Sequence, residues 1–245
     1  AMATVPLMTD EMMQEELRQL LAGAVDVLND HETALVGGHS TEGSELSLSL
    51  AITGVADGAP LTKDGLVPGQ KLVMTKGLGT GVLLAANMRG RLPVAELESV
   101  VRVMDTSNRA ALDILRRYDV RALTDISGFG FVGHLGEMLR ASGCGARIYL
   151  DEVAVLAGAV EQVKAQVTSS LQTNNEQAFA DVELRGADWG DPRARLLADP
   201  QTSGGLLAAL PGRQAAKCLD ALFQAGYHHA AIVGDVTNEG TVVEA

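Results

Sequence analysis

After Pro68, short apolar segments with strand character alternate with helical segments to the end of the chain. Strands are predicted at 71–75, 121–125, 146–151 and 229–236, and another follows the turn at 199–205. Helices are predicted at 82–90, 94–118, 131–141 and 212–226. Strands that alternate with helices form α/β domains, in which the helices cover a sheet. We therefore expect residues 69–245 to form a complete C-terminal α/β domain.

The first 68 residues predict a smaller assembly of one helix and two strands. Thr9, followed by two acidic residues, is a typical helix start, and apolar residues at helical spacing continue to about Asn29. Strands are predicted at 33–38 and 44–54. The second strand alternates strictly and puts one apolar stripe on one face: Leu46, Leu48, Leu50 and Ile52. Such a stripe favours association, so we expect a homodimer.

A segment rich in Gly, Pro and Asp, 57–70, is interpreted as a connector, with a domain boundary near Pro68. Residues 1–68 then form an incomplete N-terminal half. The 245 residues suffice for two such parts with a real core, which must be built from aliphatic residues because aromatic residues make up only 3%.

The charge balance excludes several classes of partner. With 19 basic and 31 acidic residues, the net charge is -12, which is the opposite of a nucleic-acid-binding or membrane-surface protein. The sequence has neither a membrane-spanning apolar run nor a secretory signal. Cys144 and Cys218 lack metal-site spacing and are expected to be buried, reduced thiols. These features together predict a cytoplasmic protein that binds no nucleic acid and no membrane.

The stretch "LVGGHS" (35–40) places a serine beside a histidine, as some hydrolases do. A nucleophile elbow requires G-x-S-x-G between a strand and a helix. Here the spacing is G-x-S-x-x-G and a strand is predicted to follow, so the hydrolase interpretation fails. Gly37 and Gly38 fit either a plain turn or a phosphate-binding cradle of exposed backbone N–H groups.

Three further motifs are ambiguous when each is taken alone. "TKGLGTG" (75–81) has Lys76 before the glycines, unlike a Walker A loop, and fits either a tight strand-to-helix turn or an anion-binding loop. "TDISGFG" (124–130) places Asp125 at a strand end, where it could bind Mg²⁺ or cap a turn, and His134 could face the same loop or be structural. "DPQTSGG" (199–205) opens a turn and contains no diagnostic residue.

Taken in order, these motifs resemble the selenophosphate synthetase (selenide, water dikinase) family from about Leu28 to the C-terminus. The resemblance rests on five segments: "LVGGHS", "TKGLGTGVLLAA", "LTDISGFGFVGHLGEML", "SSLQTNN" and "LADPQTSGGLLAA". It implies the fold of the wider aminoimidazole ribonucleotide synthetase-like group, which includes a hydrogenase-maturation dehydratase and thiamin-phosphate kinase. It also implies a homodimeric enzyme that converts ATP, selenide and water into selenophosphate, AMP and orthophosphate.

The resemblance implies specific residue roles. Gly37, Gly38 and His39 would contact ATP across the dimer interface, which favours the phosphate cradle over the turn. Asp125 would bind one of the Mg²⁺ ions that accompany ATP. No catalytic residue is assigned, and the roles of the remaining motif residues stay open: Lys76, His134, Asn175 and Ser203.

The sequence also departs from the family pattern. Family members carry an N-terminal segment with a reactive Cys or selenocysteine, a Lys and further metal-binding aspartates, and nothing in this chain matches them. Several carboxylates are needed to hold Mg²⁺ ions against a triphosphate. We therefore expect this chain to be a C-terminal portion that is inactive alone. The alternatives are another ATP-dependent kinase or synthetase of small metabolites with the same fold, and a non-catalytic dimerising remnant.

Overall fold

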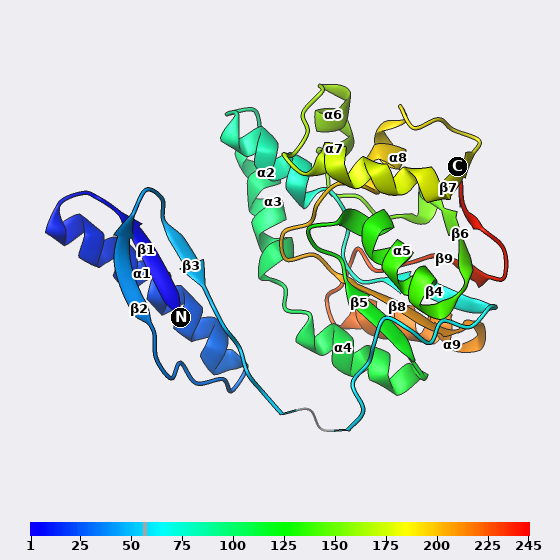
Figure 1. The fold of residues 1–245 in the computed structure, drawn as a ribbon, viewed down its shortest axis with the longest axis horizontal. Coiled ribbons are helices and arrows are strands. Elements are labelled where there is room, and N and C mark those ends of the chain that lie inside the picture. Colours follow the sequence, from blue (N-terminus) through cyan, green and yellow to red (C-terminus); the bar gives the residue numbers. More distant parts are fainter. Residues whose placement is uncertain (56–57) are drawn as a thin grey trace. The chain divides into compact units, whose positions relative to one another are not determined.

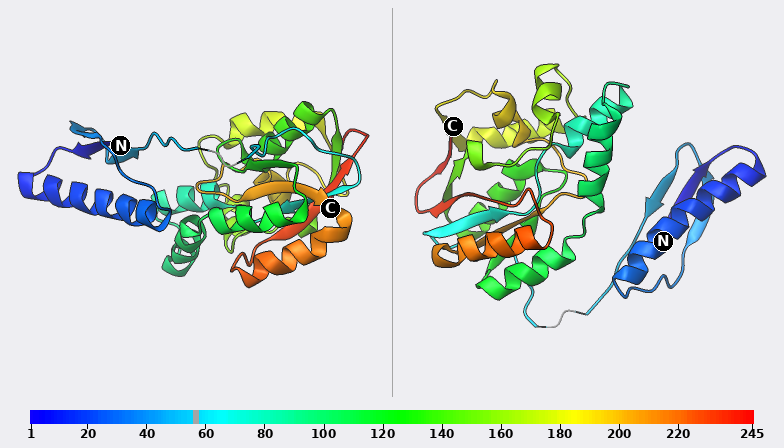
Figure 2. Two further views of the ribbon diagram at one scale, coloured as in Figure 1. Left: turned by 90° about the horizontal axis from the view of Figure 1, so that it is seen from below. Right: turned by 180° about the vertical axis from the view of Figure 1, so that it is seen from behind.

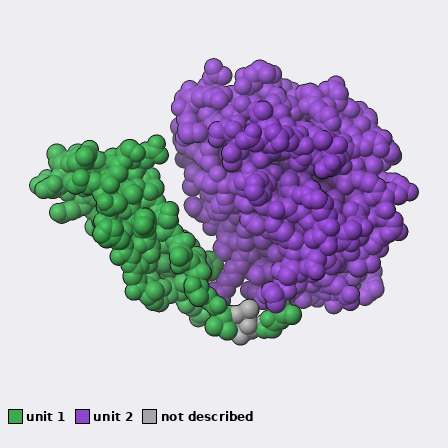
Figure 3. Space-filling view, in the orientation of Figure 1, with its two compact units in different colours: residues 1–59 green, residues 60–245 purple. Residues whose placement is uncertain are grey.

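The computed structural model describes residues 1–55 and 58–245 and consists of two compact units, 1–59 and 60–245 (Figure 3). Residue 57, the first of the expected connector, lies outside the described residues. The connector's later residues pack on the second unit: Leu66 is buried in its core, and Lys63 pairs with Glu137 at 2.6 Å. The sequence-based boundary near Pro68 therefore lies within the contacts of the second unit.

The first unit contains one helix and a three-stranded sheet of order β2-β1-β3. Its elements are β1 (Met2–Pro6), α1 (Asp10–Asp30), β2 (His39–Gly43) and β3 (Ser47–Ser49). The central strand β1 runs parallel to β2 and antiparallel to β3. The predicted helix is confirmed, and it starts directly after Thr9 with two acidic residues that face the positive end of the helix dipole.

The strand predictions for this unit were only partly right. Residues 33–38 form no strand, and of the predicted strand 44–54 only Ser47–Ser49 pairs. Strand β1, which the sequence analysis did not predict, explains the difference, because it is the strand that both others pair with. Its five residues pair with β2 along their whole length, whereas β3 meets only Met2–Thr4.

The first unit buries very little apolar surface. Among its described residues, the buried apolar side chains are Ala3 and Val5, both on β1, and α1 buries none. The predicted apolar stripe is largely open, since Leu46, Leu50 and Ile52 are 44%, 43% and 71% exposed. Hydrophobic burial is the main force that stabilises a fold, so this unit by itself has an incomplete core.

The second unit is built on a seven-stranded mixed sheet of order β5-β8-β4-β9-β6-β10-β7 (Figures 1 and 2). The strands are β4 (Gln70–Met74), β5 (Ala122–Asp125), β6 (Gly145–Tyr149), β7 (Val182–Arg185), β8 (Leu206–Pro211), β9 (Ala231–Thr237) and β10 (Thr241–Glu244). The pairs from β5 to β6 are antiparallel, whereas β10 is parallel to both β6 and β7. All predicted strands after Pro68 are present, and the four-residue strands β7 and β10 were missed.

The helices of the second unit are α2 (Thr80–Met88), α3 (Val94–Asp105), α4 (Arg109–Leu115), α5 (Gly130–Ser142), α6 (Ala159–Lys164), α7 (Gln172–Asn175), α8 (Pro192–Leu196) and α9 (Gly212–Gln224). The single long helix predicted at 94–118 is wrong, because the chain is extended at Thr106 and a new helix begins at Arg109. Tyr227 stabilises the break between the two helices, because its hydroxyl donates to the Ser107 carbonyl and accepts from the Ala111 N–H.

Two apolar layers cover the two faces of this sheet. On one face, Leu72 and Met74 of β4 pack in a cluster with Phe131 and Leu135 of α5. On the other face, Val73 belongs to a cluster formed with α4 and α9. This alternation is the period of two that a strand buried on both faces requires. A third cluster joins α2, α3 and α6.

The two cysteines are free, and they differ in burial. Cys218 is buried in α9, and burial raises the pKa of its thiol to about 11. Cys144 is only half-buried, so the expectation that both thiols are fully enclosed was wrong for this one. In the described ranges, no helix has both the length and the apolar character needed to cross a bilayer.

Candidate functional site

The loop between α8 and β8, residues 199–205, connects the motifs of the second unit. The side-chain oxygen of Gln201 accepts hydrogen bonds from the N–H groups of Gly79 and Thr80, at 3.0 and 3.2 Å. The Asp199 Oδ2 atom accepts from the N–H of Gly81 at 3.1 Å. These N–H groups lie at the N-terminus of α2, and the free N–H groups at a helix N-terminus can bind an anion. The structure therefore favours the turn interpretation of "TKGLGTG", since its helix-opening N–H groups are already bonded.

Asp199 is fully buried, and burial is the main cause that raises the pKa of its carboxyl to about 7. Hydrogen bonds from Gly81, Val82 and Gln201 oppose that shift, because they favour the charged form. Its second oxygen, Oδ1, has no hydrogen-bond partner. The carboxyl points at α2 and not at solvent, so it caps that helix.

Asp125 is the last residue of β5 and its side chain is exposed. The loop that follows is fixed by the 199–205 loop. The N–H of Ile126 donates to the Gly205 carbonyl at 2.8 Å, and the N–H of Gln201 donates to the Ser127 carbonyl at 2.9 Å. These hydrogen bonds hold the loop that follows the exposed Asp125 carboxylate at the strand end. The role of Asp125 as a metal ligand stays a prediction.

Asn175, at the end of α7, also holds this loop in place by hydrogen bonds, although it lies far from the loop in the sequence. Its side-chain amide donates to the carbonyls of Gly128 and Ala198, at 2.9 and 3.0 Å. Gly130 follows with φ +68°, and a side chain there would meet the backbone of Ala198. The motif "SSLQTNN" therefore contributes an anchor for the glycine loop beside Asp125.

His134 of α5 faces this loop, as one of the two sequence interpretations held. Its Nε2 lies 3.3 Å from the Ser127 hydroxyl, and its Nδ1 lies 3.6 Å from Glu137, which is paired with Lys63. Burial is the main cause that lowers the pKa of His134, while the charges of Asp125 and Glu137 raise it. A neutral imidazole that contacts a serine hydroxyl can accept or donate a proton there.

The donor set around Asp125 fits one ligand of a hard cation. Its carboxylate makes no hydrogen bond or salt bridge with the residues that the structure describes, so its oxygens are available. Mg²⁺ prefers carboxylate oxygens and keeps several other oxygen ligands. In 1–55 and 58–245, no three His, Cys, Asp or Glu side chains converge on one metal position. Asp125 can therefore supply one oxygen ligand of a larger set.

Gly37, Gly38 and His39 lie in the first unit and are exposed. Contrary to the sequence analysis, the glycine pair precedes a strand and does not follow one, since β2 begins at His39. The His39 N–H donates to the Ala1 carbonyl at 3.0 Å, and a side chain at Gly38 would collide with that carbonyl. A surface hollow of about 460 Å³ is lined by the three residues together with parts of β1 and α1.

Known proteins resemble this chain at the level of sequence. Residues 67–244 match the family model described as "AIR synthase related protein, C-terminal domain". A selenide, water dikinase of Pelobacter propionicus is 38% identical over 98% of the chain, and one of Trichlorobacter lovleyi is 38% identical over 87%. The chain belongs to the selenide, water dikinase family. It spans 69% and 60% of the length of these two relatives.

Solved structures show how far the fold of this selenide, water dikinase family member is shared. A hydrogenase maturation protein of E. coli is 19% identical with a TM-score of 0.68, and a thiamine-monophosphate kinase of Stenotrophomonas maltophilia is 18% identical with a TM-score of 0.65. The chain covers 68% and 70% of their lengths. At this identity the likeness shows the fold alone, which confirms the expected aminoimidazole ribonucleotide synthetase-like architecture.

The sequence analysis assigned no role to the residues that organise the site of this family member. Gln201 and Asp199 bind the start of α2, and Lys76 donates to the Ser203 carbonyl at 2.9 Å. Ser203 itself has φ +50°, a conformation that residues other than glycine rarely adopt. The run of polar residues between Asp-Pro and Gly-Gly was the available signal, since a loop rich in amide and hydroxyl groups can cap backbone groups elsewhere.

Proposed function

We propose that this chain contributes the C-terminal domain and part of the ATP site of a cytoplasmic selenide, water dikinase. The proposed reaction converts ATP, selenide and water into selenophosphate, AMP and orthophosphate. The observation that carries the proposal is the 38% identity to the Pelobacter propionicus enzyme over 98% of the chain. The rigid glycine loop that presents Asp125 supports it, because phosphoryl transfer depends on fixed groups around a charged substrate.

The proposal gives Asp125 the role of a Mg²⁺ ligand, and Gly37, Gly38 and His39 the role of an ATP contact. Mg²⁺, when bound, would neutralise charge on the triphosphate and polarise its phosphoryl oxygens. The availability of the Asp125 oxygens supports the first role. The exposed hollow beside Gly37 and Gly38 supports the second, since glycine backbones allow phosphate oxygens to approach closely.

The test is to assay the full-length protein, meaning this chain together with the N-terminal segment that the resemblance implies. Incubation with ATP, Mg²⁺ and selenide should release AMP and orthophosphate in equal amounts, measured by chromatography, and only when selenide is present. A different kinase on the same fold would release ADP and would not need selenide. Release of ADP alone would therefore overturn the proposal.

We also propose that the first unit mediates homodimerisation through its apolar face, defined as Leu46, Leu50 and Ile52. These side chains are among the large apolar residues that the chain leaves exposed, although water disfavours such a surface. Light scattering should give a dimer or larger species and not the 25.6 kDa monomer.

The variant Ile52→Ser should weaken this association at least about tenfold, because burial of each isoleucine side chain contributes roughly 1.5–3 kcal/mol and a homodimer loses two of them. Val94→Ser is the matched control, since Val94 is an equally exposed aliphatic residue (72%) in the second unit. A clean monomer across micromolar concentrations would contradict the proposed dimer. Equal effects of the two variants would show that the apolar face is not the interface.

A further inference from the structure

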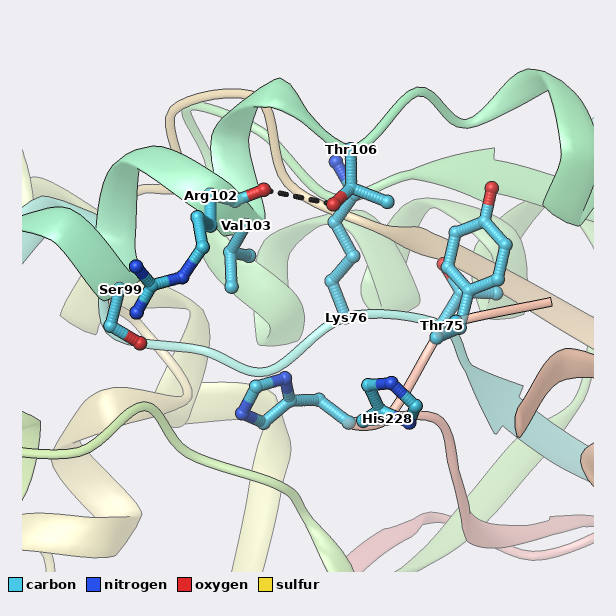
Figure 4. A pocket seen from close by; sticks show the side chains of 10 residues that line it. Thr75, Lys76, Ser99, Arg102, Val103, Thr106 and His228 are labelled. Atoms are coloured by element: carbon cyan, nitrogen blue, oxygen red, sulfur yellow. Dashed lines mark hydrogen bonds between the residues drawn. The ribbon is translucent and has the colours of Figure 1, made fainter. Parts of the chain in front are cut away.

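A cavity of about 200 Å³ opens in the second unit between the β4–α2 loop, α3 and the segment before β9 (Figure 4). Four of its lining residues carry or can carry positive charge: Lys76, Arg102, His228 and His229. Ser99 and Thr106 add hydroxyl groups, and neither Asp nor Glu belongs to the described lining. In a chain with net charge -12, this concentration of basic side chains in one hollow is selective for negative charge.

Lys76 is the buried basic group of this cavity, with only 3% of its surface exposed. Its amine donates to the Ser203 carbonyl at 2.9 Å, and no described carboxylate pairs with it. An ammonium group has three donors, so two remain without a protein acceptor in the contacts that the structure describes. Burial of an unpaired charge is costly, and a bound anion would offset that cost.

Two histidines, His228 and His229, also line the cavity. A side chain at Gly77 would lie 3.3 Å from the His229 ring, so the glycine makes room for that imidazole. Burial lowers the pKa of His229, with a smaller contribution from His228, and burial lowers the pKa of Lys76 to about 8. A bound anion would act in the opposite direction on both pKa values, because it favours the charged forms.

The walls of the cavity are held in place by hydrogen bonds. Thr106 donates to the Arg102 carbonyl at 2.8 Å and closes the end of α3, as Figure 4 shows. Tyr227 fastens the segment before β9 through its bonds to Ser107 and Ala111. A cavity with fixed walls binds a small ligand without the entropic cost of ordering them.

The geometry points to a binding site for a phosphate-class oxyanion in this cavity, which is lined by Lys76, Arg102, His228 and His229. Tetrahedral oxyanions accept several hydrogen bonds at once, and Arg, Lys and protonated His side chains donate them. Neither Asp125 nor any residue of the Gly37–His39 stretch belongs to the described lining of this cavity. It does not depend on the proposed reaction, because its occupancy can be measured without ATP or selenide.

The test is a titration of the 245-residue chain with inorganic phosphate, followed by NMR of the histidine rings. The signals of His228 and His229 should move and saturate, whereas those of His134 and His31 should stay, which gives an internal reference. A parallel titration with AMP distinguishes free phosphate from the phosphate of a nucleotide. Larger shifts with AMP would assign the oxyanion to a nucleotide, and larger shifts with inorganic phosphate would assign it to the free ion.

Two variants make the test specific to the cavity. Arg102→Gln should weaken phosphate binding at least about fivefold, because a charge-assisted hydrogen bond is lost. Arg91→Gln removes the same charge from an exposed residue outside the cavity lining and should leave binding unchanged. Lys76→Met tests the buried amine of the cavity lining, and if this variant fails to fold, Arg102→Gln still decides the question. Absence of saturable shifts up to about 50 mM phosphate, or equal binding by Arg102→Gln and Arg91→Gln, would overturn the inference.

Discussion

The 245-residue chain on its own is expected to release no AMP when it is incubated with ATP, Mg²⁺ and selenide. Its net charge of -12 opposes binding of a triphosphate unless metal ions bridge the two. Asp125 supplies one carboxylate, whereas a magnesium–triphosphate complex is held by several. The resemblance places the others, with the reactive Cys and Lys, in the N-terminal segment of the family.

We expect that neither cysteine of this chain replaces the reactive cysteine that the resemblance places in the N-terminal segment. Cys218 is buried with a pKa of about 11, so its thiol stays protonated and unreactive at neutral pH. Cys144 is half-buried, and its sulfur contacts the carbonyls of Leu66 and Ser142 at 3.5 Å.

The absence of AMP formation is measured by chromatography of the nucleotide products, with the full-length protein as the positive control. Steady AMP formation above a sample without protein would contradict the prediction and would point to Lys76 or His134 as reacting groups.

Replacing Asp125 by alanine in the full-length protein is expected to lower selenide-dependent AMP formation at least about tenfold. The reason is the loss of one metal ligand beside the triphosphate, and a tenfold change corresponds to about 1.4 kcal/mol of transition-state stabilisation. The melting temperature should change little, because the side chain is exposed and makes no hydrogen bond or salt bridge with the described residues. Rate assays and thermal unfolding of the same preparation check both statements.

A matched control separates metal binding from loss of charge. Asp220→Ala removes an exposed carboxylate from α9, far along the chain from the glycine loop, and should leave the rate unchanged. Asp125→Asn keeps the shape of the side chain and lacks its charge, so it should resemble Asp125→Ala, with partial recovery at high Mg²⁺. Wild-type activity of Asp125→Ala at limiting Mg²⁺ would mean that Asp125 is only a turn residue.

Much of the second unit could be predicted from sequence because its strands and helices have clear periodicity. Strand β4 alternates between two buried faces, and α5 and α9 carry one apolar side each, so their positions follow from local pattern. The break at Thr106 could not be predicted in this way. Helical periodicity continues across it, and the hydroxyl of Tyr227, more than a hundred residues later in the chain, holds the two helices apart.

The site shows the same division between local and distant causes. The sequence identified Asp125 at a strand end and the glycines around it, because a carboxylate before a glycine loop is recognisable in a few residues. It could not assign the 199–205 loop, whose Gln201 and Asp199 cap α2 more than a hundred residues earlier in the chain. Nor could it reveal that Lys76 lines a basic cavity together with Arg102 and His229.

The sequence by itself therefore determined the alternation of elements in the second unit and the family to which the chain belongs, since both depend on residues close together in the chain. Only the tertiary structure decided which glycine N–H groups were already bonded, which strand paired with β1, and which basic side chains share one cavity. The physical reason is that hydrogen bonds, strand pairs and charge clusters form between groups that are close in space, whatever their separation in the sequence. The hydrogen bond from the Gly69 N–H to the Val236 carbonyl joins residues that lie 167 positions apart in the sequence (236 minus 69).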